Sequence, residues 1–163
     1  MADKIYIGGA LANPDVVRLT KMLLDEKYDT FSEWFTPGPD ADVLWRDYEL
    51  ALGYDYREAL NRPAAQQIFS FDKRHIDASD VFVMLMPCGK SAHLELGYAV
   101  GTGKRTIIYM PEQPDRWDVM VTAADAIVYT DDELLLALEG EEGPWTIASS
   151  TSTPLSNGMN DQS

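Results

Sequence analysis

Val81-Phe-Val-Met-Leu-Met86 is an unbroken apolar run that lies between Asp80 and Pro87. A short apolar run bounded by a charged residue and a proline predicts a strand buried on both faces, as in a parallel sheet. The turn residues Pro87-Cys-Gly89 follow it, and the apolar spacing of residues 91–100 then predicts a helix that packs on the sheet. We therefore expect a strand–turn–helix unit over residues 81–100.

Similar units flank this one on both sides. Further strands are predicted by short runs rich in β-branched or aromatic side chains, at residues 4–7, 30–35, 106–110 and 126–129. Helices are predicted between them, at residues 14–24, 41–60, 63–78, 118–124 and 131–138. Alternating strands and helices are typical of a parallel sheet covered by helices. The sequence thus predicts an α/β fold with five parallel strands and helices on both faces.

Length and charge restrict the class of protein. The chain has 163 residues, which suits one domain, and its 13 Lys and Arg against 27 Asp and Glu give a net charge of −14. Nucleic acid polymers and anionic membranes are bound by basic surfaces, so we expect neither as a partner. No apolar run approaches the roughly 18 residues of a membrane span, and no secretory signal is visible. Cys88 is the single cysteine, so we expect no internal disulfide, no cysteine-based metal site and a cytoplasmic location.

The composition changes at about residue 139. Glu139-Gly-Glu-Glu-Gly143 is followed by a stretch rich in Ser and Thr, which has too little apolar surface to order itself. We therefore expect one domain over residues 1–139 and a disordered, acidic and Ser/Thr-rich tail over residues 140–163. Trp145 is the side chain in this tail that is able to dock locally.

Glu95 is the most informative polar residue. In an open parallel sheet, ligands bind beyond the carboxyl ends of the strands, and residues 87–95 lie there. The neighbours of Glu95 are small, which leaves room for a substrate. On pattern alone, Glu95 is also explained as an ordinary acid near a helix N-terminus, where the helix dipole favours it.

Two other motifs in the same stretch have weaker functional interpretations. Cys88 with His93 as its base is a candidate nucleophilic pair, although a lone cysteine beside a buried strand is more often a small apolar filler. Gly89-Lys-Ser91 resembles the end of a phosphate-binding P-loop, but Met84 stands where that motif needs a glycine. A Walker-type NTPase is therefore not expected.

A family resemblance rests on several motifs taken together. Ser79-Asp80 before the central strand, Glu95-Leu-Gly-Tyr-Ala99 after the turn and Gly103-Lys104 before the next strand resemble the nucleoside 2-deoxyribosyltransferase family. That family includes the related deoxynucleoside 5′-monophosphate N-glycosidases. The opening Ile5-Tyr-Ile-Gly-Gly9 resembles its first strand and glycine turn, so the resemblance covers about residues 3–130. It implies a doubly wound, flavodoxin-like sheet, no metal or organic cofactor, and a homo-oligomer whose neighbouring chains complete the active site.

The resemblance also implies an activity. Members cleave the N-glycosidic bond of a 2′-deoxynucleoside or its 5′-monophosphate, so Glu95 would attack C1′ and form a covalent deoxyribosyl-enzyme. A second base or water would then take the sugar. Asp72, eight residues before Asp80, would assist departure of the base, and Tyr6 would orient Glu95. Taken as isolated residues, Asp72 also fits a solvated helix position and Tyr6 a core aromatic.

The remaining residues expected at the site are those that we expect to contact the substrate. They are Gly8, Gly9, Gly89, Lys90, Ser91 and His93. Relatives that use free nucleosides often carry an acid in the turn at residues 89–91, whereas those that use monophosphates place a serine and backbone N–H groups there. Lys90 and Ser91 at a helix N-terminus therefore favour a nucleotide over a nucleoside. His93 contacts either the sugar or the phosphate in this interpretation, and a purely structural role is the alternative.

Residues 31–60 fit the family least. Their aromatic side chains form either a wall or lid that stacks on the base, or part of the core or of a subunit interface. The aromatic residues concerned are Trp34, Phe35, Trp45 and Tyr48. Two other functions stay open for the whole chain: a glycohydrolase of a ribonucleotide or NAD-like substrate, and a non-catalytic nucleotide-binding module.

Overall fold

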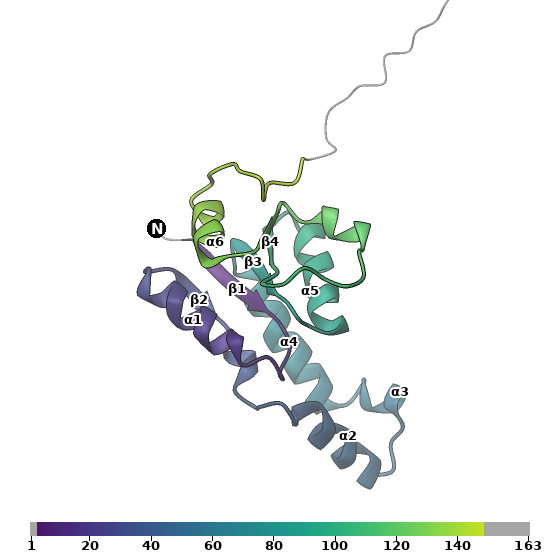
Figure 1. Cartoon of the computed structure of the whole chain (residues 1–163). Coiled ribbons are helices and arrows are strands. Elements are labelled where there is room, and N and C mark those ends of the chain that lie inside the picture. Colours follow the sequence, from purple (N-terminus) through teal and green to yellow (C-terminus); the bar gives the residue numbers. More distant parts are fainter. Residues whose placement is uncertain (1–2, 149–163) are drawn as a thin grey trace, which may run out of the picture.

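The structure, a computed structural model, describes residues 3–148 and contains one parallel sheet (Figure 1). Its strands are β1 (Lys4–Gly8), β2 (Asp29–Phe31), β3 (Val81–Leu85), β4 (Arg105–Tyr109) and β5 (Ala126–Val128). They lie in the order β2-β1-β3-β4-β5, and every neighbouring pair is parallel. This is the strand order of a doubly wound, flavodoxin-like sheet, so the expected fold class is confirmed.

Helices cover both faces of the sheet. The helical elements are α1 (Asp15–Asp25), α2 (Ala41–Ala51), α3 (Tyr56–Ala59), α4 (Pro63–Asp77), α5 (Lys90–Gly101) and α6 (Asp131–Leu138), with two short 3₁₀ turns, η1 (Glu33–Phe35) and η2 (Val119–Ala123). One core cluster joins the sheet to α1 and α6, and a second joins its other face to α4 and α5. Among the described residues, no helix is long and apolar enough to cross a membrane.

The central strand is buried along its whole length. Val81, Val83 and Leu85 face the α1 and α6 side, whereas Phe82 and Met84 face α4 and α5. Successive side chains of a strand point to opposite faces, and here both faces are covered, which explains the unbroken apolar run.

Most expected elements differ from the structure by a residue or two at their ends, and the short helix expected at residues 118–124 is the 3₁₀ turn η2. Two elements differ by more. The strand expected over residues 30–35 stops at Phe31, because the following residues turn into η1 and Trp34 Nε1 donates a hydrogen bond to Ile7 O over 2.6 Å. The single helix expected over residues 41–60 is divided into α2 and α3. Gly53 lies between them at φ +88°, a conformation that favours glycine and does not continue a helix. Asp55 then starts α3 with a capping box that includes Glu58.

The start of the expected tail is held against the sheet. Ile127 N donates to Trp145 O, and Ile147 N donates to Asp125 O, both over 2.9 Å. The indole of Trp145 packs on the core cluster beneath α1 and α6. The chain therefore keeps contact with β5 beyond the boundary expected at residue 140, while residues 149–163 of the expected tail lie outside the described part.

Candidate active site

The sheet reverses its winding direction between β1 and β3. The chain leaves β1 toward β2 on one side, and later leaves β3 toward β4 on the other. The connections that follow the two strands therefore run in opposite directions. Sheets of this kind bind ligands between these connections, at the carboxyl ends of the strands. Gly8 and Gly9 come from the end of β1, and the turn at residues 86–89 comes from the end of β3.

Glu95 reaches this end of the sheet from α5. Its Oε2 lies 3.4 Å from the point that a Cβ atom on Gly8 would occupy, so the carboxylate sits against the β1 backbone. The same Cβ would overlap the ring of Phe82. A glycine at position 8 is thus required for close packing beneath Glu95. The structure therefore gives Gly8 a packing role, whereas the sequence predicted that it contacts the substrate.

Tyr6 lies in the sheet under the same site. Its ring is stacked between Phe31 and Phe82, with ring centroids 5.4 and 5.3 Å away. Its hydroxyl is buried and has no hydrogen-bond partner of ordinary geometry among the described residues. Burial is the main cause that raises the Tyr6 pKa, and the nearby charges of Glu95 and Asp72 raise it further. Tyr6 is therefore a core aromatic whose polar end faces both carboxyl groups.

Asp72 lies on α4 and is the second carboxyl group of the site, after Glu95. Its pKa is raised to about 6 by burial. The pKa of Glu95 is raised to about 7, first by burial and then by the negative charge of Asp72, while the Tyr6 hydroxyl opposes this rise. The fold thus brings together Tyr6, Asp72 and Glu95, which are 89 positions apart in the sequence at their extremes. A pair of half-buried carboxyl groups with raised pKa values, at the carboxyl ends of parallel strands, is typical of a functional site.

Both carboxyl groups have raised pKa values. A leaving-group acid is expected to hold its proton more strongly than the nucleophile, and the free site does not separate the two groups in that order. The two groups interact, so their protons belong to the pair rather than to either residue alone.

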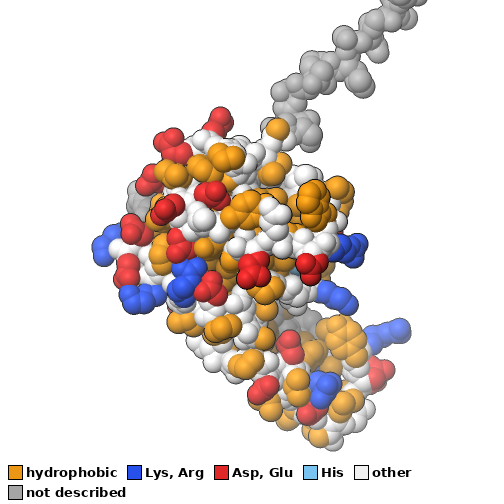
Figure 2. Space-filling model, in the orientation of Figure 1, with side chains coloured by type: hydrophobic (Ala, Val, Ile, Leu, Met, Phe, Trp, Pro, Cys, Tyr) orange, Lys and Arg blue, Asp and Glu red, His pale blue; other side chains and the backbone are white. Residues whose placement is uncertain are grey.

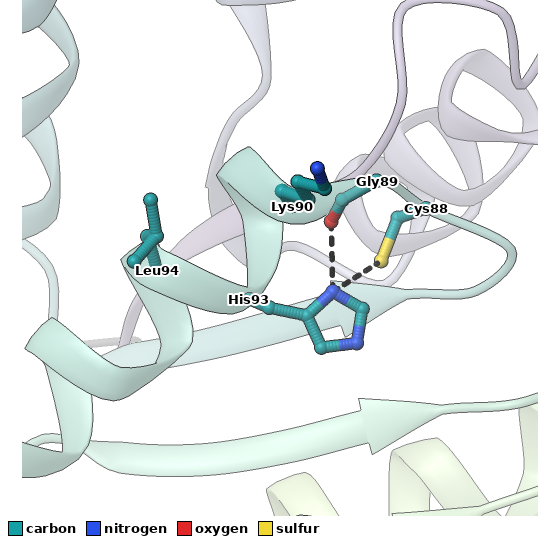
Figure 3. Close-up of a pocket in the computed structure, with 5 residues that line it drawn as sticks. All are labelled: Cys88, Gly89, Lys90, His93 and Leu94. Carbon is teal, nitrogen blue, oxygen red and sulfur yellow. Dashed lines mark hydrogen bonds between the residues drawn. The ribbon is translucent and has the colours of Figure 1, made fainter.

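The first turn of α5 lines a separate open depression of about 560 Å³, bordered by Cys88, Gly89, Lys90, His93 and Leu94 (Figure 3). Glu95, Asp72 and Tyr6 are absent from its lining, so the structure places the expected site residues in two adjacent groups. Lys90 and Ser91 are exposed there. The N-cap residue of α5 is Gly89, which has no side chain that could accept hydrogen bonds from the first N–H groups of the helix. This end of α5 has free donors for an anion.

The structure argues against Cys88 as a nucleophile. His93 Nδ1 lies 2.7 Å from Gly89 O and 3.8 Å from Cys88 Sγ (Figure 3). A carbonyl oxygen only accepts hydrogen bonds, so Nδ1 carries the proton and cannot take one from the thiol. Burial and the Glu95 charge also raise the pKa of Cys88 to about 11, which keeps the thiol protonated at neutral pH.

Gly9 and the aromatic residues of the variable segment have structural contacts. A Cβ on Gly9 would lie 3.3 Å from Val16 and 3.5 Å from Trp34, so this glycine lets α1 and η1 pack against the end of β1. Trp34 and Phe35 pack on the core. Trp34 therefore has the core role that was one of its two alternatives.

Sequence reasoning did not identify Phe82 as part of this site. The signal for it is the strand alternation, because Tyr6 and Phe82 are paired in the parallel register of β1 and β3 and face the same side. The register itself depends on how two distant segments align, which the sequence pattern leaves open.

No cluster of three or more His, Cys, Asp or Glu side chains that could hold a metal ion occurs within residues 3–148. The carboxyl groups beside Tyr6 are those of Glu95 and Asp72. Their chemistry is that of a nucleophile or base and a proton donor, which side chains perform directly.

Comparison with known proteins supports the fold. No protein-family model and no curated protein matches this chain. A solved structure of similar fold is the 2-deoxyribosyltransferase from the psychrotolerant bacterium Bacillus psychrosaccharolyticus, with a TM-score of 0.54 and 18% sequence identity. The similarity covers 80% of this chain and 89% of that one, whose protein is described as a biocatalyst for the synthesis of antiviral and antitumoral nucleosides. At this identity the likeness establishes the shared fold.

Proposed function

We propose that this protein cleaves the N-glycosidic bond of a 2′-deoxynucleoside or its 5′-monophosphate, with Glu95 as the nucleophile. The observation that carries the proposal is the half-buried Glu95 carboxyl against the carboxyl end of β1, whose pKa is raised by burial and by Asp72 and which interacts with the Tyr6 hydroxyl. The likeness to a 2-deoxyribosyltransferase supports it, since that enzyme has this fold and acts in nucleoside synthesis.

The first step exchanges one bond at C1′ for another. A Glu95 oxygen forms a bond to C1′ while the C1′–N bond breaks, and its electron pair leaves with the base. Asp72 donates its proton to the departing base, which keeps that base from leaving as an anion. Such reactions pass through a sugar with oxocarbenium character, which a nearby carboxylate stabilises. The products are a covalent deoxyribosyl-enzyme and a free base.

The second step releases the enzyme. A nitrogen of a second base, or the oxygen of water, forms a bond to C1′ as the Glu95–C1′ bond breaks. Asp72, now ionised, takes the proton that the incoming group loses. The first acceptor gives transfer and the second gives hydrolysis, so one pair of carboxyl groups serves both outcomes.

A bound base also favours the protonated form of Asp72 and the ionised form of Glu95. In the free site, Glu95 has a pKa of about 7 and Asp72 of about 6. A base that lies against Asp72 removes water from it, and desolvation raises the pKa of a carboxyl group. Substrate binding thereby moves the shared proton toward Asp72 and leaves Glu95 ionised for attack.

The first turn of α5 favours a 5′-monophosphate over a free nucleoside. Lys90 and Ser91 are exposed beside the uncapped helix N-terminus, and no acid occupies the turn at residues 89–91. Backbone N–H groups at a helix N-terminus bind phosphate well. We expect Lys90→Ala and Ser91→Ala to raise KM for monophosphates while leaving KM for free nucleosides nearly unchanged.

The test is a chromatographic assay of base release and base exchange. Wild-type protein is incubated with each 2′-deoxynucleoside, each 5′-monophosphate and the matching ribonucleotides, with and without a free acceptor base. Glu95→Gln should abolish turnover, and Asp72→Asn should slow it by about 10²- to 10⁴-fold, the usual contribution of an acid–base group. Glu112→Gln, at an exposed position, is the matched control and should turn over at the wild-type rate.

A quenched reaction adds a direct readout of the intermediate. Mass spectrometry should find the deoxyribosyl group on the peptide that contains Glu95, and not on the same peptide of the Glu95→Gln variant. Turnover of ribonucleotides or NAD-like substrates instead would favour the glycohydrolase alternative. Binding with no turnover in the whole panel would overturn the proposal and favour a nucleotide-binding module.

A further inference from the structure

A row of four aromatic rings crosses the sheet on the face that α4 and α5 cover. Phe82, Tyr6 and Phe31 occupy matching positions of three adjacent strands, because Tyr6 pairs with both of the others in the parallel register. The Tyr6 ring is stacked on each, with centroids 5.3 Å from Phe82 and 5.4 Å from Phe31. The fourth ring is His75 of α4, whose centroid lies 3.8 Å from that of Phe31, with 7° between the ring planes. The row therefore continues from the sheet into α4.

The helix α4 meets the sheet through its second half. Its first half leaves the sheet together with α2 and α3 (Figure 1), and Figure 2 shows this part of the molecule as a projecting lobe that carries apolar and charged side chains. Within α4, all of which the structure describes, Ile76 is the single buried residue. Helices are ordinarily held in place by an apolar face that packs, and α4 packs little of its own. Few side chains can therefore fix how α4 is rotated about its axis.

Phe71 adds a ring contact on the same side of α4 as His75. Its ring centroid lies 5.8 Å from that of Phe31 and 4.6 Å from that of His75. Phe71 and His75 are four residues apart, so they lie on the same face of the helix, one turn apart. Two consecutive turns of α4 thus pack rings against the one aromatic side chain that β2 contributes to the row.

Asp72 lies on the part of α4 that these contacts orient. It stands three residues before His75 and four before Ile76, and side chains at these spacings are neighbours on a helix. His75 is stacked on Phe31 and Ile76 is buried in the core, so they hold the helix on either side of Asp72. A rotation of α4 about its axis would carry the Asp72 carboxyl away from Tyr6.

We propose that His75 is a positioning residue for Asp72: its ring, stacked on Phe31, holds α4 in the rotation that places the Asp72 carboxyl beside Tyr6. The catalytic consequence of this inference rests on the proposed function, in which Asp72 is the proton donor. The placement of Asp72 itself does not, because it is visible in the electrostatics of the site. The charge of Asp72 raises the pKa values of both Tyr6 and Glu95.

Histidine suits this place chemically. The His75 side chain is half-buried, and an imidazole is flat enough to stack while its ring nitrogens form hydrogen bonds with water. Burial, followed by the charges of Lys4 and Arg74, lowers the pKa of His75, and Glu33 opposes this change. The ring that stacks on Phe31 is therefore neutral at pH 7.

The ¹³C titration midpoint of Glu95 tests the inference without any catalytic readout. His75→Ala should lower the Glu95 pKa by up to about one pH unit, because the Asp72 charge then moves away and no longer raises it. In an Asp72→Asn background, His75→Ala should cause no further change, since that charge is already absent. A loosening that merely admits water would lower the midpoint equally in both backgrounds, and that result would overturn the inference.

Three other variants separate the stack from the folding of the chain. His75→Phe keeps a ring that can stack on Phe31, so it should keep the wild-type midpoint. His75→Leu keeps apolar bulk without a flat ring, so it should fold even if His75→Ala does not, and it should lower the midpoint. Gln67→Ala, at an exposed position of α4, is the matched control and should change nothing. A wild-type midpoint in His75→Leu would refute the role of the stack.

Turnover gives a second test, which depends on the proposed function. His75→Ala should lower kcat by about 10²-fold with little change in KM, as a small misplacement of a catalytic group does. In the double variant with Asp72→Asn the two losses should not add, because His75 acts through Asp72. Fully additive losses would contradict the inference and leave the proposed function intact. An inactive wild type would instead overturn the proposed function, and the titration would then decide this inference by itself.

Discussion

Replacing Glu95 with Gln should stabilise the protein at pH 8 and leave its stability nearly unchanged at pH 4. The wild-type carboxyl has its pKa raised from 4.5 to about 7, because it is buried against the β1 backbone and faces Asp72. Gln has nearly the same shape as protonated Glu and never ionises. The substitution therefore removes the cost of holding a charge there and keeps the packing.

The sign and size of the effect follow from proton binding. In the unfolded chain this carboxyl releases its proton near pH 4.5, but in the folded protein it does so only near pH 7. Between these values the folded state binds more protons, so rising pH favours unfolding. At 1.36 kcal/mol for each pH unit, the wild type loses about 3 kcal/mol by pH 8, and the variant does not. For a domain of this size, that corresponds to a difference of about 10 °C in Tm.

The assay is urea or thermal unfolding of both proteins from pH 4 to pH 8. The Glu112→Gln variant, at an exposed position, should follow the wild type throughout. If Glu95→Gln has the same effect on stability at pH 4 as at pH 8, or no effect at either, the carboxyl is not held at a raised pKa and the electrostatic description of the site is wrong.

Three other substitutions probe the same site, and a fourth, Gly97→Ala, is the control for one of them. Asp72→Asn should lower the Glu95 pKa, which is measured as the midpoint of a ¹³C NMR titration. Burial is the larger cause of the raised Glu95 pKa, so removing the Asp72 charge should change it by about one pH unit at most. Tyr6→Phe should raise the Glu95 pKa in the same titration, because the Tyr6 hydroxyl lowers that pKa. The hydroxyl has no hydrogen bond of ordinary geometry, so its loss should cost less than about 1 kcal/mol of stability. Gly8→Ala should lower the free energy of unfolding in urea by about 1–3 kcal/mol, because the new Cβ would overlap Phe82. Gly97→Ala should raise it by up to about 1 kcal/mol, because Gly97 lies within α5 with open space around it and alanine favours the helix. Equal effects of the two glycine substitutions would contradict the close approach at Gly8.

Local patterns fixed most of the secondary structure in advance. The apolar run at residues 81–86 predicted β3 almost to its bounds, because a strand covered on both faces needs an apolar side chain at every position. The division of residues 41–60 into α2 and α3 was missed. The signal for it is Gly53, whose positive φ does not continue a helix.

The sequence by itself determined the class of fold and the edge of the sheet where a ligand is expected, because both follow from the order of strands and helices along one chain. It also placed Glu95 at that edge. Only the tertiary structure decided that Gly8 lies beneath the Glu95 carboxylate, and that burial raises the pKa of both Glu95 and Asp72. These properties depend on which distant segments pack together and how much water they exclude, and a pKa is set by that surrounding rather than by the residue type.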